Sequence, residues 1–166
     1  RWASPIPFLM MNSYRTREDS IATLSAYPDL GAGLPLDFLQ NKVPRIDSES
    51  WEPVAWEEHP DLDWCPPGHG DFYVALKCSG MLDRLLHRGI RYEFVSNADN
   101  LGAVLDPGIL GWIAQERIPF VMEVAARTRA DRKGGHLATR GGRLMLREVA
   151  QCLPEDRGDF EDVSKH

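Results

Sequence analysis

Two polar residues, Asn97 and Asp99, end the largely apolar stretch "YEFVSNADN" (92–100). In open α/β sheets, ligands bind outside the carboxyl ends of the strands. A carboxylate at that place can bind Mg2+ with few other protein ligands, because this ion keeps several waters and takes further oxygens from substrate phosphates. The pattern predicts a metal-assisted phosphate site at this strand end. The alternative is that both side chains only stabilise a turn.

The stretch "WCPPGHGDFY" (64–73) surrounds His69 with two glycines and places two prolines before them. Prolines stiffen the backbone, whereas glycines permit backbone angles and close approaches that a side chain would forbid. We therefore expect a ligand to come very near this backbone. His69 itself could act as a general base, donate a hydrogen bond to a phosphate, or serve only in packing.

A third candidate, "DRKGGH" (131–136), joins cationic side chains to a glycine pair, as a cradle for a phosphate or a sugar requires. The alternative is the start of a hairpin with charged neighbours. Further along, Glu148 and Gln151 could accept or donate hydrogen bonds to hydroxyl groups, or could simply be exposed. No GxxxxGK motif is present, so this segment is not a P-loop.

Covalent catalysis is not indicated, because the chain has no Gly-x-Ser-x-Gly elbow. Chemistry that needs only positioning, a metal and cationic donors fits better. Three cysteines without a CxxC pair favour reduced thiols over a disulfide framework. A zinc site could be drawn from four residues, but their spacing matches no standard pattern: His59, Cys65, His69 and Cys78.

Strands and helices are expected to alternate along the chain, which is typical of a mostly parallel sheet covered by helices. Apolar runs predict strands at residues 7–12, 34–40, 92–100 and 119–125. Between the first two strands we expect a helix that starts at Thr16 and stops at Pro28, while residues 41–63 should be irregular.

Three local signals predict the remaining elements. Residues 72–86 should form one helix, or two helices broken near Gly80. Asp106 should cap a further helix that has Pro107 at its first position. The segment 133–149 reads as a hairpin whose glycine pair at 141 and 142 suits a primed turn.

Composition narrows the functional classes. With 166 residues and 43% hydrophobic content, the chain has the size of one domain with a sizeable core. A net charge of -6 argues against a general nucleic-acid binder, which needs a basic face. No apolar run has the length of a membrane span and no secretory signal precedes the first strand, so we expect a cytoplasmic protein without a membrane partner.

Five stretches, taken together and in order, resemble one family, the UTP-glucose-1-phosphate uridylyltransferases or UDP-glucose pyrophosphorylases. They are "MNSYRTRED" (11–19), "FLQNKVPRID" (38–47), "WCPPGHGDFY" (64–73), "FVSNADNLGAVLD" (94–106) and "RTRADRKGGHL...LREVAQ" (127–151). The resemblance covers nearly the whole chain. It implies a Rossmann-like, GT-A-like nucleotidyltransferase fold, in which helices flank a mixed, mostly parallel sheet.

The resemblance also implies the reaction. UTP and glucose 1-phosphate would give UDP-glucose and pyrophosphate with Mg2+, by in-line attack of the sugar phosphate on the α-phosphorus and without a covalent enzyme intermediate. The protein's task is then alignment and charge neutralisation.

Site residues follow from the resemblance position by position. On the nucleotide side, Gln40 would read the uracil edge, Gly68 would lie against the base or ribose, and Asp99 would bind Mg2+. His69 and Asn97 would contact the sugar phosphate. The complete set expected to line the substrate site is His69, Asn97, Ala98, Asp99, Lys133, Gly134, Gly135 and Glu148, with the last four on the glucose side.

The sequence also departs from the family. Members carry a glycine-rich loop of the type "LNGGLGTSMG" and a lysine before the strand that matches "PFLMMN", and they continue with a further catalytic section and a left-handed β-helix. Residues 1–166 are therefore expected to be a partial catalytic domain that is inactive alone. The alternatives are a related UDP-sugar or UDP-N-acetylhexosamine pyrophosphorylase and a non-catalytic module that binds a nucleotide sugar.

Overall fold

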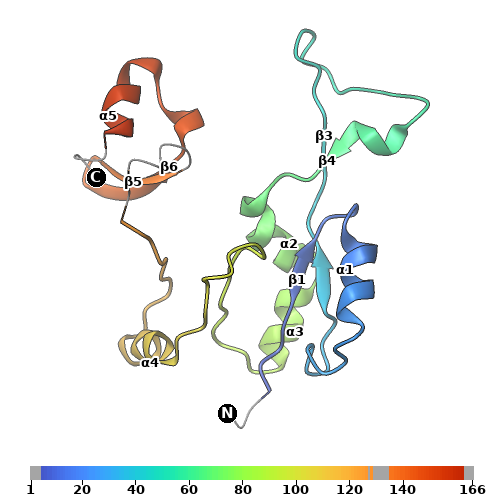
Figure 1. The fold of residues 1–166 in the computed structure, drawn as a ribbon, viewed down its shortest axis with the longest axis vertical. Helices are drawn as coiled ribbons and strands as arrows, with labels where there is room; N and C mark the ends of the chain where they lie inside the picture. The colour runs from blue at the N-terminus through green and yellow to red at the C-terminus, as the bar shows by residue number, and fades with distance from the viewer. Residues whose placement is uncertain (1–4, 127, 129–134, 163–166) are drawn as a thin grey trace. The chain divides into compact units, whose positions relative to one another are not determined.

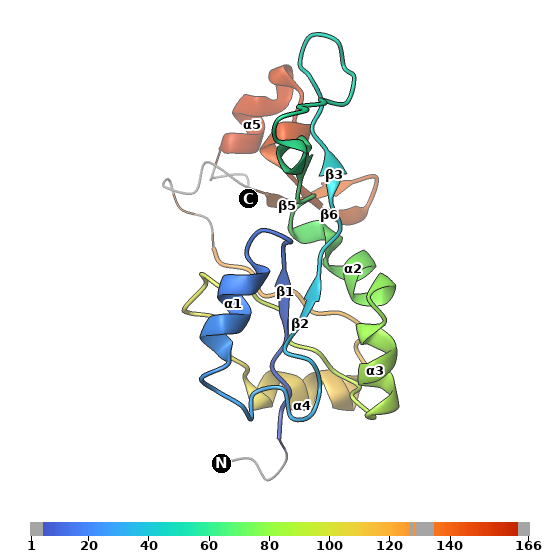
Figure 2. The same ribbon diagram turned by 90° about the vertical axis from the view of Figure 1, so that its right-hand side faces the viewer.

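A computed structural model describes residues 5–126, 128 and 135–162. Two compact units divide the chain between Asn97 and Ala98, and each is considered by itself. Helices and short strands are mixed in both, and the described strands form three two-stranded sheets (Figures 1 and 2).

The first unit is built on a parallel pair of strands, β1 (Met10–Asn12) and β2 (Asp37–Leu39). Parallel strands need a crossover connection, and α1 (Arg17–Leu24) lies within it. Figures 1 and 2 both show the strand pair between α1 on one side and the helices α2 (Phe72–Cys78) and α3 (Met81–His87) on the other. The strands expected at 7–12 and 34–40 are thus confirmed, although both are shorter.

Apolar side chains of β2, α2 and α3 form the core of the first unit. Five of them are buried, and they are Phe38, Ala75, Leu76, Met81 and Leu85. Each large core side chain contributes roughly 1.5–3 kcal/mol on burial. The predicted helix break is confirmed, because Gly80 separates α2 from α3 with φ 75°, a left-handed angle that glycine adopts without steric cost.

A buried carboxylate joins α1 to both strands. The Asp37 side chain is only 4% exposed and accepts hydrogen bonds from Arg17 Nε at 2.8 Å and from Asn12 Nδ2 at 3.2 Å. Burial favours the neutral acid, but the hydrogen bonds from Arg17 and Asn12, together with the Arg17 charge, outweigh it and lower the pKa of Asp37. The ionised form therefore stabilises the fold.

Asp37→Asn should lower the free energy of unfolding near neutral pH. The loss should be smaller than the ~3–5 kcal/mol typical of a fully buried ion pair, because the Arg17 side chain is 52% exposed to solvent. A lowered folded-state pKa contributes stability above the ordinary aspartate value of about 3.9, and this contribution is lost as the pH falls through the folded value. In urea unfolding, the difference in free energy of unfolding between wild type and Asp37→Asn should accordingly be smaller at about pH 3 than at about pH 7. Asp29→Asn, at an exposed position, is the control. A difference that does not change with pH would contradict the prediction.

Residues 41–63 are largely irregular, as expected. They contain β3 (Val43–Pro44), an isolated antiparallel bridge between Ile46 and Pro53, and η1 (Pro60–Asp63). The strand β3 pairs antiparallel with β4 (Trp64–Cys65). The pairing fixes the start of the proline and glycine loop that follows β4.

The strands predicted at 92–100 and 119–125 are wrong for this structure. Residues 91–97 and 119–125 have no regular secondary structure, and side chains such as Phe94 (47% exposed) and Phe120 (64% exposed) are open to solvent. An apolar run becomes a strand only where another strand pairs with its backbone. Among the described residues, neither segment has such a partner.

The second unit confirms the local signals. The helix α4 (Pro107–Glu116) starts at Asp106, whose carboxylate accepts from the backbone N–H groups of Gly108 and Ile109. The predicted hairpin consists of β5 (His136–Arg140) and β6 (Arg143–Arg147). Its turn has φ 57° and 76° at the glycine pair, as a type I′ turn requires.

The end of the second unit packs on the hairpin. After η3 (Val149–Gln151) and η4 (Pro154–Asp156), the short α5 (Arg157–Glu161) buries Phe160, whose ring centroid lies 4.7 Å from that of His136.

The mostly parallel Rossmann-like sheet stays a prediction. In the described part of the chain, β1 and β2 form the single parallel pair, and the other two sheets are antiparallel. None of the described helices combines the length and apolar character needed to cross a membrane.

Candidate functional site

The loop between β4 and α2 has the unusual backbone that its glycines predict. Gly68 adopts φ 103° and ψ -176°, a region open essentially to glycine alone. A Cβ atom at this position would meet no atom within 4 Å, so the backbone angles and not crowding require glycine here. The exposed His69 follows and begins η2 (His69–Asp71). The loop is thus an exposed platform with little side-chain cover.

Three of the sequence motifs meet at the start of this loop. The Tyr14 hydroxyl donates to the Trp64 carbonyl at 2.6 Å. Lys42 places its ammonium 5.6 Å from the Tyr14 ring centroid and 5.0 Å from the Trp64 ring centroid. Both distances are within the range of cation–π attraction. The segments 11–19, 38–47 and 64–73 therefore form one structural region.

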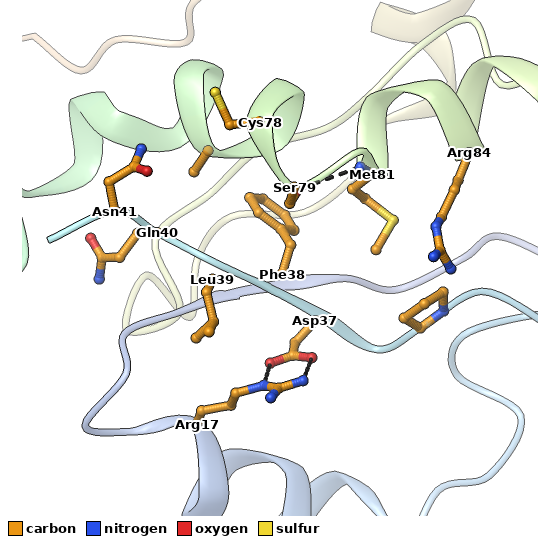
Figure 3. A pocket seen from close by; sticks show the side chains of 12 residues that line it. Arg17, Asp37, Phe38, Leu39, Gln40, Asn41, Cys78, Ser79, Met81 and Arg84 are labelled. Carbon is orange, nitrogen blue, oxygen red and sulfur yellow. Dashed lines mark hydrogen bonds and ion pairs between the residues drawn. The ribbon is translucent and has the colours of Figure 1, made fainter.

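Gln40 lies just beyond the carboxyl end of β2. Its backbone N–H donates to the Asn12 carbonyl at 2.9 Å, which extends the parallel pairing by one residue. Its half-buried side chain lines a groove of about 500 Å3 that runs along β2 beside α2 and α3. Figure 3 shows Gln40 and Asn41 at one end of this groove and Arg84 at the other.

Two residues expected to line the glucose pocket come together in the second unit. A Cβ atom added to Gly135 would lie 2.6 Å from Oε1 of Glu148, so the absence of a side chain leaves room for this carboxylate. Glu148 also takes part in a reciprocal cap with Gln151, whose Oε1 accepts from the Glu148 N–H at 3.0 Å. Lys133 and Gly134 lie outside the described residues.

Asp99 offers an uncommitted carboxylate. It lies in an exposed turn where the Leu101 N–H donates to its backbone carbonyl at 3.1 Å. No hydrogen bond or ion pair links its side chain to the rest of the described chain, and within that part no three or more His, Cys, Asp and Glu residues are grouped to hold a metal. One free carboxylate fits Mg2+, which takes its remaining oxygens from water and phosphates.

The residues predicted for the site are divided between the two units. Gln40, Gly68, His69 and Asn97 belong to the first unit, whereas Ala98, Asp99, Gly135 and Glu148 belong to the second. Sequence reasoning did not single out the residues that fasten the loop, among them Asn41, Lys42 and Asp71. The signal available was their position inside the motifs 38–47 and 64–73.

Comparisons with known proteins agree on one family. A sequence model described as UTP–glucose-1-phosphate uridylyltransferase matches residues 1–166. The curated enzyme of that name from Pyrus pyrifolia is 38% identical over 166 residues, which are 99% of this chain and 35% of the relative. The one from Saccharomyces cerevisiae is 39% identical, over 99% of this chain and 33% of the relative. This chain spans about a third of the length of these curated relatives.

Solved structures give the same result. A UDP-glucose phosphorylase from Trypanosoma brucei is 43% identical with a TM-score of 0.84, covering 97% of this chain and 36% of that one. A mutant UDP-glucose pyrophosphorylase from Leishmania major, in complex with UDP-glucose, is 42% identical with a TM-score of 0.84, covering 97% and 37%.

Proposed function

Because this chain belongs to the UTP–glucose-1-phosphate uridylyltransferase family, we propose that it carries part of the site where UTP and glucose 1-phosphate become UDP-glucose and pyrophosphate. The observation that carries this proposal is the loop at Gly68, whose glycine-only backbone leaves an uncovered platform in the same unit as Gln40. The solved relative in complex with UDP-glucose supports the same ligand class.

In the proposed reaction, an oxygen of glucose 1-phosphate attacks the α-phosphorus of UTP in line. A bond from that oxygen to phosphorus forms, the bond from the α-phosphorus to the bridging oxygen breaks, and pyrophosphate leaves. The second ionisation of a phosphate monoester has a pKa of about 6, so the attacking group is already charged at neutral pH. No protein base is then required, and the protein contributes alignment and charge stabilisation.

We assign the nucleotide end to the first unit. Gln40 would read the uracil edge through its amide, which can both donate and accept. Gly68 would present a backbone surface that the base or ribose can approach closely. His69 and Asn97 would hydrogen-bond the sugar phosphate. Asp99, which belongs to the second unit, would hold an Mg2+ ion that neutralises phosphate charge.

We assign the glucose end to the second unit. Glu148 would accept hydrogen bonds from glucose hydroxyls, and the missing side chain at Gly135 would leave its carboxylate accessible. Lys133 and Gly134 complete this part of the proposal, and Ala98 would line the substrate site beside Asp99. A Rossmann-like nucleotidyltransferase fold is part of the same proposal.

Titration with UDP-glucose and Mg2+, followed by amide NMR and thermal unfolding, tests the proposal. We expect a higher melting temperature and shifted amide signals at Gly68, His69 and Asn97. ADP-glucose should bind more weakly than UDP-glucose, because Gln40 would face adenine in place of uracil. Titration with UDP-N-acetylglucosamine tests the preference for the sugar. The absence of any shift with UDP-glucose would contradict the proposal.

A further inference from the structure

The platform loop, residues 66–70, is fastened to the same short segment at both of its ends. On the entry side, Cys65 pairs with Val43 across β3 and β4. The exit side is held by a side chain instead, because the Asp71 carboxylate binds Asn41, two residues before Val43. Both ends of this five-residue loop are therefore bonded to the segment 41–43.

At the exit, both carboxylate oxygens of Asp71 accept hydrogen bonds from Asn41. Oδ2 of Asp71 accepts from the backbone N–H of Asn41 at 2.6 Å and from Asn41 Nδ2 at 3.1 Å, and Oδ1 accepts from the same Nδ2 at 2.9 Å. Hydrogen bonds to an ionised acceptor are stronger than neutral ones. We call this Asn41–Asp71 contact the bracket.

Gln40 is held from two directions as a result. Its own N–H donates to Asn12 of β1, while the N–H of the next residue, Asn41, donates to Asp71. Phe72, the residue after Asp71, packs edge-to-face on Phe38 of the core with ring centroids 5.8 Å apart. The bracket therefore connects the residue beside Gln40 to the core through the start of α2.

We propose that Asn41 and Asp71 are positioning residues that set the spacing between Gln40 and Gly68, and through it the discrimination of the nucleobase. This inference rests on the proposed function, since it takes Gln40 and Gly68 as the two sides that a uracil must reach at once. Neither bracket residue is assigned a contact with the substrates. A change in the bracket should raise KM for UTP more than KM for glucose 1-phosphate, because His69 is the one residue proposed to contact the sugar phosphate that lies in this loop.

Exchanging the two side chains tests this idea. Asn41→Asp alone sets two carboxylates against each other and opens the bracket. Adding Asp71→Asn restores it with the partners reversed, because the new amide at position 71 can accept from the N–H of position 41 and donate to the new carboxylate there. Ser48→Asp, at an exposed position of the irregular segment 41–63, also adds one negative charge to the first unit and is the matched control.

The measurements are KM for each substrate and the preference for UTP over CTP, in the full-length natural protein. We expect Asn41→Asp to raise KM for UTP about tenfold, roughly the loss of one charge-assisted hydrogen bond, and to weaken the UTP preference. The double variant should return to within about threefold of wild type. KM for glucose 1-phosphate should rise clearly less than KM for UTP in the Asn41→Asp variant.

Two results would overturn the inference while leaving the proposed function intact. One is a double variant no better than Asn41→Asp, and the other is a rise in KM for glucose 1-phosphate equal to that for UTP, which would mark the pair as merely structural. A wild-type protein that binds no UDP-glucose would overturn the proposed function, and the inference with it.

Discussion

Asp99→Ala is expected to lower the turnover of UTP and glucose 1-phosphate by about 10²–10³-fold, the size found when one preorganised charge-stabilising group is lost. Its carboxylate makes no hydrogen bond or ion pair with the described residues, so its removal breaks no contact that supports the fold. The loss should fall on the step in which negative charge moves onto pyrophosphate. Unfolding temperature should be unchanged.

Initial rates of pyrophosphate release over a range of Mg2+ concentrations check this prediction in the full-length natural protein. Asp99→Asn should be nearly as impaired as the alanine variant, because it keeps the shape and loses the charge. Asn100→Ala changes the neighbouring exposed residue and should have little effect. Activity retained within tenfold in Asp99→Ala would show that another carboxylate binds the metal.

Gly68→Ala should weaken UDP-glucose binding about ten- to a hundredfold. A non-glycine residue held at φ 103° and ψ -176° is strained by about 1–3 kcal/mol. Because the loop is exposed and a Cβ meets nothing nearby, the variant can relieve this strain by leaving the binding conformation. The apparent affinity then falls with the fraction of molecules that keep the loop shape.

Gly70→Ala is the matched control, and calorimetric titration of both variants gives the comparison. Gly70 lies in the same exposed loop with the same open space for a Cβ, but its φ is not positive. Its variant should bind within about twofold of wild type. Equal losses in both would point to direct contact with the ligand at each glycine, and no loss in either would exclude the loop from the nucleotide site.

The elements that sequence predicted correctly are those fixed by near neighbours. Asp106 caps α4 through the N–H groups two and three residues on, and the glycine pair at 141 and 142 turns the hairpin by its own backbone angles. The same holds for Gly80, which breaks the helix by its left-handed φ. The residues that determine a cap or a turn lie within a few positions of it in the sequence.

The failures concern segments whose structure depends on distant partners. Residues 92–100 and 119–125 have strand composition, yet a strand exists only where another backbone pairs with it. The bracket was missed for the same reason, since Asn41 and Asp71 are 30 residues apart and neither type alone indicates the contact. The structure does bring Gly135 next to Glu148, and the sugar-side role that the family resemblance implied for both stays a prediction.

The fastening of residues 66–70 at both ends has a kinetic consequence. In the wild-type protein, two prolines and two anchored ends restrict the shapes of this loop, so under the proposed function a nucleotide that binds there would order little additional chain. The conformational entropy lost on binding is correspondingly small at this place. We therefore expect association to proceed without a slow local rearrangement here, which leaves any rate-limiting motion to other parts of the protein.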